Sequence, residues 1–149
     1  MISANKTPKL SVCVVTYNQE GYIRECLQSI INQTTNFEYE ILVSDDCSSD
    51  QTKFIIEDFA KLYPSIVKPH YHKKNIGAFQ NFTYVHSLAS GEYIAHLDGD
   101  DLMLPGKLQT QYEFMAANPN CMISWHRMII DDSANEIFSP QHYQANKFK

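Results

Sequence analysis

The chain has 149 residues, of which 44% are hydrophobic and 12% aromatic, and its formal net charge is −5. This length and composition suit one globular domain with its own core and exclude a disordered chain. The only basic cluster consists of His70, His72, Lys73 and Lys74, which is too short for a nucleic-acid-binding surface. An acidic protein with an anionic ligand is expected to bind it through a metal and backbone amides.

The sequence carries no sign of secretion or of a membrane span. Residues 1–9 form a polar tail that lacks the apolar core of a signal peptide, and no apolar run approaches the roughly 20 residues of a spanning helix. No two of the four cysteines have C-x-x-C spacing, which predicts buried thiols in a reducing compartment. These cysteines are Cys13, Cys26, Cys47 and Cys121. We therefore expect a cytoplasmic protein, with association at the inner face of the membrane left open.

Apolar runs and helical periodicities alternate along the chain. Strand-like runs cover 10–15, 39–43, 66–71 and 93–97, and Pro69 indicates that the third is either an edge strand or a short one. Four helices are predicted between and after these runs, each with apolar residues at helical spacing on its buried face. In chain order these faces are Ile23, Cys26, Leu27, Ile30 and Ile31 in the first helix, Ile55, Phe59 and Leu62 in the second, Phe79, Phe82, Val85 and Ala89 in the third, and Leu108, Tyr112 and Met115 in the fourth. A fifth apolar run extends from Cys121 to Ile130.

Strict alternation of strand and helix predicts an α/β fold with a mainly parallel sheet flanked by helices on both faces. Ligands of such sheets bind outside the carboxyl ends of the strands. Polar clusters at 16–20, 44–50 and 98–101 each follow a predicted strand. One edge of the sheet is therefore the expected site.

The last of these clusters is acidic, with Asp98, Asp100 and Asp101 within four positions. Neighbouring carboxylates repel one another, and oxygen ligands at this spacing suit Mg²⁺ or Mn²⁺. Gly99 removes side-chain bulk between Asp98 and Asp100 and allows an unusual backbone conformation. A solvated acidic loop that caps the next helix is the alternative for an Asp-x-Asp considered alone.

Other nucleotide-binding fingerprints do not fit. The first strand is not followed by G-x-G-x-x-G, and the chain contains no G-x-x-x-x-G-K-[ST]. Leu102 and Leu104 stand where a calcium loop needs ligating residues. A dinucleotide fold, a P-loop and an EF-hand are therefore disfavoured.

Four motifs in fixed order lead to a family resemblance. They are Val14–Asn18, Ser44–Asp50, Asn75–Gly77, and Leu97–Asp101 followed by Pro105. With these separations the chain resembles the family 2 glycosyltransferases of the GT-A fold, from about Leu10 to about Ile130. The resemblance implies a Rossmann-like nucleotide-sugar-binding domain at 10–130. A polar segment at 131–149 would then end before the acceptor-binding half.

The resemblance also implies roles for individual residues around a nucleotide-sugar donor, usually a UDP-sugar. Thr16, Tyr17 and Asn18 would line the base and ribose pocket, with Glu20 nearby. Asp46 would accept a hydrogen bond from the imide N–H of uracil, which a fixed carboxylate selects.

The remaining implied contacts lie further along the chain. Asn75 and Gly77 match the loop that closes on the donor. Asp98 would contact the ribose or the metal, and Asp100 would ligate Mn²⁺ or Mg²⁺ directly.

The activity implied is inverting transfer of a sugar to a saccharide or lipid-linked acceptor in cell-surface polysaccharide synthesis. Asp131 and Asp132 do not match the family's catalytic acid motif, so we expect the base beyond Lys149. Two other functions stay open: a non-catalytic nucleotide-sugar-binding module, and another metal-dependent nucleotidyl or phosphoryl enzyme.

Several polar or aromatic residues also have a purely structural interpretation. Asp50 or Ser49 is expected to cap the following helix, and Asp45 equally suits a turn. His96 is expected in the core. Core packing is also favoured for Trp125, with stacking against an acceptor sugar as the alternative.

Overall fold

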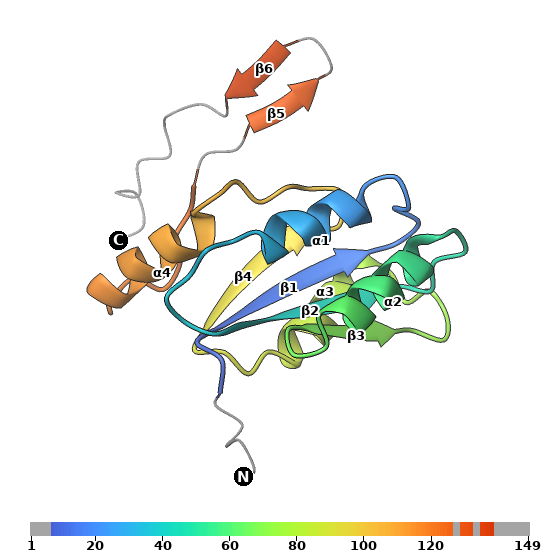
Figure 1. The fold of residues 1–149 in the computed structure, drawn as a ribbon, viewed down its shortest axis with the longest axis horizontal. Helices are drawn as coiled ribbons and strands as arrows, with labels where there is room; N and C mark the ends of the chain where they lie inside the picture. Colours follow the sequence, from blue (N-terminus) through green and yellow to red (C-terminus); the bar gives the residue numbers. More distant parts are fainter. Residues whose placement is uncertain (1–6, 127–128, 133–134, 139–149) are drawn as a thin grey trace. The chain divides into compact units, whose positions relative to one another are not determined.

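The computed structural model describes residues 7–126, 129–132 and 135–138, and the chain divides into two compact units, 1–113 and 114–149. In the first unit strands and helices alternate (Figure 1). They are β1 (Leu10–Thr16), α1 (Ile23–Ile31), β2 (Tyr39–Asp45), α2 (Thr52–Leu62), β3 (Val67–Tyr71), α3 (Ala78–Ser87) and β4 (Tyr93–Asp98). Helix α4 (Lys107–Ala117) begins in this unit.

The four strands form one parallel sheet in the order β3-β2-β1-β4. The α/β fold predicted from the alternating pattern is therefore confirmed, and Pro69 lies on an edge strand as expected. Because all strands run the same way, Thr16, Asp45 and Asp98 end their strands at one edge of the sheet. This edge is where the polar clusters gather.

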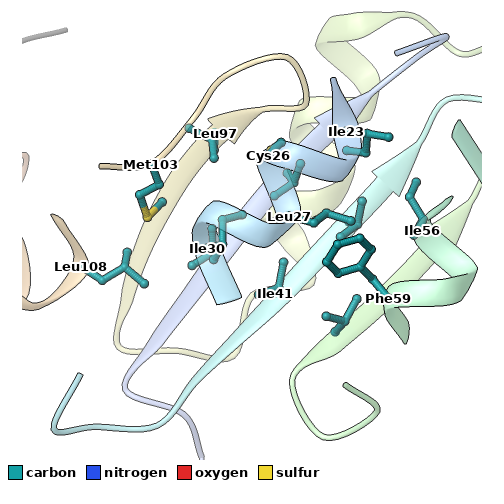
Figure 2. Packing of buried hydrophobic residues seen from close by; sticks show 14 of the residues in the cluster. Ile23, Cys26, Leu27, Ile30, Ile41, Ile56, Phe59, Leu97, Met103 and Leu108 are labelled. Atoms are coloured by element: carbon teal, nitrogen blue, oxygen red, sulfur yellow. The ribbon is translucent and has the colours of Figure 1, made fainter. Parts of the chain in front are cut away.

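Helices cover both faces of the sheet, as predicted. On one face α1 and α2 pack buried side chains spaced three or four residues apart against β1 and β2 (Figure 2). These side chains are Ile23, Cys26, Leu27 and Ile30 of α1, and Ile56 and Phe59 of α2. On the other face Val85 of α3 packs against Cys13 and Leu42. Burying each such aliphatic side chain contributes about 1.5–3 kcal/mol.

The predicted inward faces of two helices are partly wrong. Leu62 of α2 is 70% exposed, Phe79 of α3 is 78% exposed, and Phe82 is also exposed. Thr52 and Asn81, which are polar, are buried instead, because each hydrogen-bonds a backbone group beside the sheet. A count of apolar residues alone misplaces the buried face of both helices.

The second unit contains a short hairpin. Residues 121–126 have no regular structure, and β5 (Ile129–Asp132) pairs antiparallel with β6 (Asn135–Phe138). Trp125 is 88% exposed, so the core packing expected for it is wrong. Apart from 131–132 and 135–138, the predicted polar segment at 131–149 lies outside the described residues.

All four cysteines are free thiols, but only Cys13 and Cys26 are buried, whereas Cys47 and Cys121 are partly exposed. Burial raises the pKa of Cys13 and of Cys26 to about 12. In the portion of the chain that the structure describes, none of the helices has the length and apolar character needed to cross a bilayer.

A buried carboxylate ties the amino ends of the strands together. Glu40 of β2 accepts hydrogen bonds from Ser11 Oγ (2.7 Å) on β1 and from Ser90 Oγ (2.7 Å) before β4, and pairs with Lys68 of β3. Burial by itself raises the pKa of Glu40, but the hydrogen bonds from Lys68, Ser11 and Ser90 outweigh it and hold the pKa at about 2. Glu40 is thus charged and fully partnered.

Replacing Glu40 by alanine is expected to lower the free energy of unfolding by about 3 kcal/mol, because buried donors lose their acceptor.

The depressed pKa of Glu40 also predicts that the stability of the protein depends on pH. The contribution of Glu40 is complete above its ordinary pKa of 4.5 and is lost as the pH falls toward 2. Urea unfolding between pH 2 and 7 measures both effects. The Glu40→Gln variant, which has no charge to titrate, should lack this pH-dependent part. An unchanged pH profile in that variant would contradict the assignment.

Candidate functional site

A cavity of about 270 Å³ opens at the carboxyl edge of the sheet. Six of the residues predicted from the sequence line it: Thr16, Tyr17, Asp46, Asn75, Gly77 and Asp98. They come from the ends of β1, β2 and β4 and from the loop before α3. Segments more than 80 residues apart in the chain, from Thr16 to Asp98, therefore meet around one hollow.

Asp46 connects two walls of the cavity. Its carboxylate, only 2% exposed, accepts hydrogen bonds from the backbone N–H groups of Ile76 (2.7 Å) and Gly77 (2.9 Å). Its own N–H donates to the carbonyl of Thr16 (3.0 Å). A carboxylate has about four acceptor sites, so Asp46 retains capacity for a ligand donor.

The loop before α3 depends on glycine. Gly77 has φ +91°, a conformation that side-chain-bearing residues rarely adopt, and it stands immediately before the first residue of α3. Its N–H also lies 3.1 Å from Asn75 Oδ1. The loop is thereby fixed at the rim of the cavity.

Two predicted nucleotide contacts, Asn18 and Glu20, are absent from the cavity lining and bridge two loops instead. Asn18 Oδ1 accepts the N–H of Ser49 (2.8 Å), and the Glu20 carboxylate accepts the N–H of Gln51 (2.7 Å). In return, the N–H of Glu20 donates to Asp50 (3.1 Å). These bonds join the loop after β1 to the loop after β2 and fix the position of both.

The structural interpretation of Asp45 is confirmed, and that of Asp50 only in part. The N-cap residue of α2 is Gln51, which makes no side-chain capping bond, but Asp50 Oδ1 accepts the N–H of Thr52 (3.0 Å), the first residue of α2. Asp45 accepts hydrogen bonds from the backbone and the hydroxyl of Ser48, which closes a turn. Burial, with repulsion from Asp50 and Asp46, raises the pKa of Asp45 despite these bonds.

Gly99 must lack a side chain, as expected, but because of Thr16 and Gln19 rather than because of its neighbours Asp98 and Asp100. It does not adopt a positive φ, but a Cβ at this position would lie 2.5 Å from Gln19 Oε1 and 2.9 Å from Thr16 Cβ. Its N–H donates to the carbonyl of Val15 (2.9 Å). The close approach of these backbones brings Asp98 to the cavity.

The acidic cluster offers oxygen ligands for a cation. Asp98 lines the cavity, whereas Asp100 and Asp101 are exposed beside it and do not. Partial desolvation of Asp101, together with the negative charges of Asp100 and Asp98, raises the pKa of its carboxyl group. Oxygen donors of this type fit Mg²⁺ or Mn²⁺. Within the described residues no three Asp, Glu, His or Cys side chains are arranged around one point as a metal site. A cation here would need further ligands from a diphosphate or water.

Sequence reasoning missed two polar residues of the lining, Gln19 and Asn81. Gln19 Oε1 accepts a hydrogen bond from Thr16 Oγ1 (2.7 Å), and the Asn81 amide bonds the carbonyl of Ser44 (3.1 Å). Asn81 has a weak sequence signal: it lies four residues before Val85, on the buried face of α3.

The side chain of His96 is 33% exposed, so the residue is only partly buried, which corrects the expectation of a core histidine. Its Nε2 lies 3.0 Å from Asp98 Oδ1. Burial lowers the pKa of His96, although the nearby Asp98 acts in the opposite direction.

The substitution Gly99→Ala should lower the free energy of unfolding by about 2 kcal/mol, because the new methyl group overlaps Thr16 and Gln19. Gly21→Ala is the matched control, since a Cβ there has no neighbour within 4 Å. Urea unfolding of both variants checks the prediction. Equal losses would show that close packing against β1 is not the reason for glycine at position 99.

The sequence matches the family model described as "Glycosyl transferase family 2" over residues 11–149. The "Uncharacterized protein Rv1520" of Mycobacterium tuberculosis is 38% identical over 130 residues, which cover 85% of this chain and 38% of that protein. The "Putative teichuronic acid biosynthesis glycosyltransferase TuaG" of Bacillus subtilis is 34% identical over 111 residues, covering 74% of this chain and 43% of TuaG.

Among solved structures, S. aureus TarS 1-349 in complex with UDP-GlcNAc matches with a TM-score of 0.66 and 31% identity. The match covers 74% of this chain and 32% of that chain. This chain therefore spans less than half the length of each of these three relatives.

Proposed function

Because the chain belongs to glycosyl transferase family 2, we propose that the cavity at the carboxyl edge of its sheet binds a nucleotide-sugar donor, a UDP-sugar. The observation that carries this proposal is the position of Asp46, a buried carboxylate with remaining acceptor capacity on the cavity wall. The match to a TarS structure that contains UDP-GlcNAc, at 31% identity, supports uracil as the base.

The base is proposed to lie between Asp46 and Tyr17. Uracil presents one imide N–H between two carbonyl groups, and a fixed carboxylate is its natural partner. The ring of Tyr17 is 47% exposed at the cavity and provides an aromatic surface for the base. Thr16 lines the same wall toward the ribose.

Asn75 and Gly77 are proposed to contact the donor from the loop that Asp46 holds. Asn18 and Glu20, first predicted as nucleotide contacts, are proposed to contribute by fixing the loops that carry Tyr17 and Asp46. Their substitution would then weaken nucleotide binding without changing which base is preferred.

Asp98 and Asp100 are proposed to hold Mn²⁺ or Mg²⁺, since their oxygens suit a hard divalent cation. When bound, the ion supplies positive charge against the departing diphosphate. Because Asp98 lines the cavity, it is also proposed to contact the ribose of the donor. Asp100, which lies beside the cavity, is proposed to contact the ion and no other part of the donor.

The proposed reaction is inverting transfer of the sugar to a saccharide or lipid-linked acceptor in cell-surface polysaccharide synthesis. The similarity to TuaG, whose name places it in teichuronic acid biosynthesis, supports this setting. A general base must remove the proton from the acceptor's hydroxyl group. This residue is proposed to lie in the part of the relatives that this chain does not cover. A cytoplasmic location is also proposed, with association at the inner face of the membrane left open.

A binding module that does not transfer sugar is the second candidate, because the chain spans less than half of its relatives. It would bind UDP with Mn²⁺ and show no product with any acceptor. Hydrolysis of the nucleotide that needs no sugar, and that Asp98→Asn abolishes, would instead indicate a phosphoryl or nucleotidyl enzyme.

Isothermal titration calorimetry with UDP tests the role of Asp46. The Asp46→Asn variant should bind UDP at least about tenfold more weakly, because the amide removes the charged acceptor for the imide N–H. Asp58→Asn is the control, since Asp58 is an exposed carboxylate of α2 that does not line the cavity. Unchanged affinity in Asp46→Asn would refute the proposed base contact.

The same titration with and without Mn²⁺ tests the cation site. Wild-type protein should bind UDP more tightly with Mn²⁺, and Asp100→Ala should lose most of this gain while its metal-free affinity stays the same. If UDP binding does not depend on the metal and is unchanged in Asp100→Ala, the assignment of Asp100 is wrong.

A further inference from the structure

His96 lies on β4 two residues before Asp98, and its Nε2 is 3.0 Å from Asp98 Oδ1. The carboxylate accepts this hydrogen bond, so Nε2 carries the proton and donates it. The Asp98 side chain is 57% exposed and lines the cavity. An exposed carboxylate without a partner would sample several rotamers. The contact with His96 selects one of them.

The imidazole of His96 is itself held in place by two rings of α3. The centroid of Phe82 lies 4.7 Å away in an edge-to-face arrangement, and that of His86 lies 5.1 Å away. Phe82 and His86 stack on each other at 3.9 Å. The donor that reaches Asp98 therefore comes from a side chain with little freedom of its own.

The other ring nitrogen of His96, Nδ1, indicates why position 96 is a histidine. Nδ1 of His96 is buried and has no hydrogen-bond partner within the described residues, which is unfavourable for a polar atom. A phenylalanine would fill the same space against Phe82 and His86 without a desolvated nitrogen. What histidine adds at this position is the N–H directed at Asp98.

We propose that His96 is a positioning residue, which orients the Asp98 carboxylate toward the ribose or the divalent cation of the bound donor. This inference rests on the proposed function of the cavity. His96 itself does not line the cavity and acts only through Asp98.

Calorimetry with UDP in the presence of Mn²⁺ tests the inference. His96→Phe keeps an aromatic ring but removes the donor, and it should weaken UDP binding by about five- to tenfold. His96→Gln, whose amide nitrogen reaches the position of Nε2, should restore the affinity to within about threefold of wild type. His86→Phe is the matched control, because it alters the same ring cluster without a bond to Asp98, and it should bind like wild type.

A double-mutant cycle with Asp98→Ala separates positioning from general damage to the fold. His96→Phe should have no further effect on UDP affinity once Asp98 is alanine. Additive losses, or an unchanged affinity in His96→Phe alone, would overturn the inference. If His96→Phe does not fold, His96→Gln and His96→Asn replace it, since the asparagine amide reaches only the Nδ1 position. Equal UDP affinities of these two variants would likewise overturn the inference.

The outcome also distinguishes this inference from the proposed function. If wild-type protein does not bind UDP, the proposed function itself fails. If wild type binds UDP and Asp98→Ala weakens binding, but His96→Phe does not, only the role of His96 is refuted.

Discussion

The candidate site depends on the hydrogen bonds between the Asp46 carboxylate and the N–H groups of Ile76 and Gly77. A buried carboxylate is stable only with donors around it, and backbone N–H groups in a loop need acceptors. The N–H groups of the loop satisfy the carboxylate, and the carboxylate satisfies the loop, although the two segments are about 30 residues apart in the chain. The cavity wall is consequently formed before any ligand arrives, which lowers the ordering cost of binding.

The two ends of β2 use buried carboxylates for different purposes. Glu40, at the amino end, is paired with Lys68 and surrounded by the hydroxyl groups of Ser11 and Ser90, so it serves the fold. Asp46, just beyond the carboxyl end, has neutral backbone donors and lines the cavity, where it remains able to accept from a ligand. In a parallel sheet the carboxyl ends share one edge, which explains why the site forms there.

The sequence predicted the parallel sheet well, because β1, β2 and β4 are each a largely apolar run followed by a polar cluster. It also predicted that Thr16, Asp46 and Asp100 would converge on one hollow, since they follow strands of one parallel sheet. Thr16 and Asp46 line the cavity together with Asp98, whereas Asp100 does not. It did not predict that Asn18 and Glu20 face the neighbouring loop, because that depends on bonds between segments about 30 residues apart. A polar residue after a strand looks the same in sequence whether it contacts a ligand or a loop.

A crystal structure of this chain with UDP and Mn²⁺ tests the central claim most directly. The account predicts the uracil ring inside the cavity beside Tyr17, with its imide N–H within hydrogen-bond distance of Asp46 and the diphosphate toward Asp98. Ordered UDP outside this cavity, with Asp46 bonded only to Ile76 and Gly77, would contradict it.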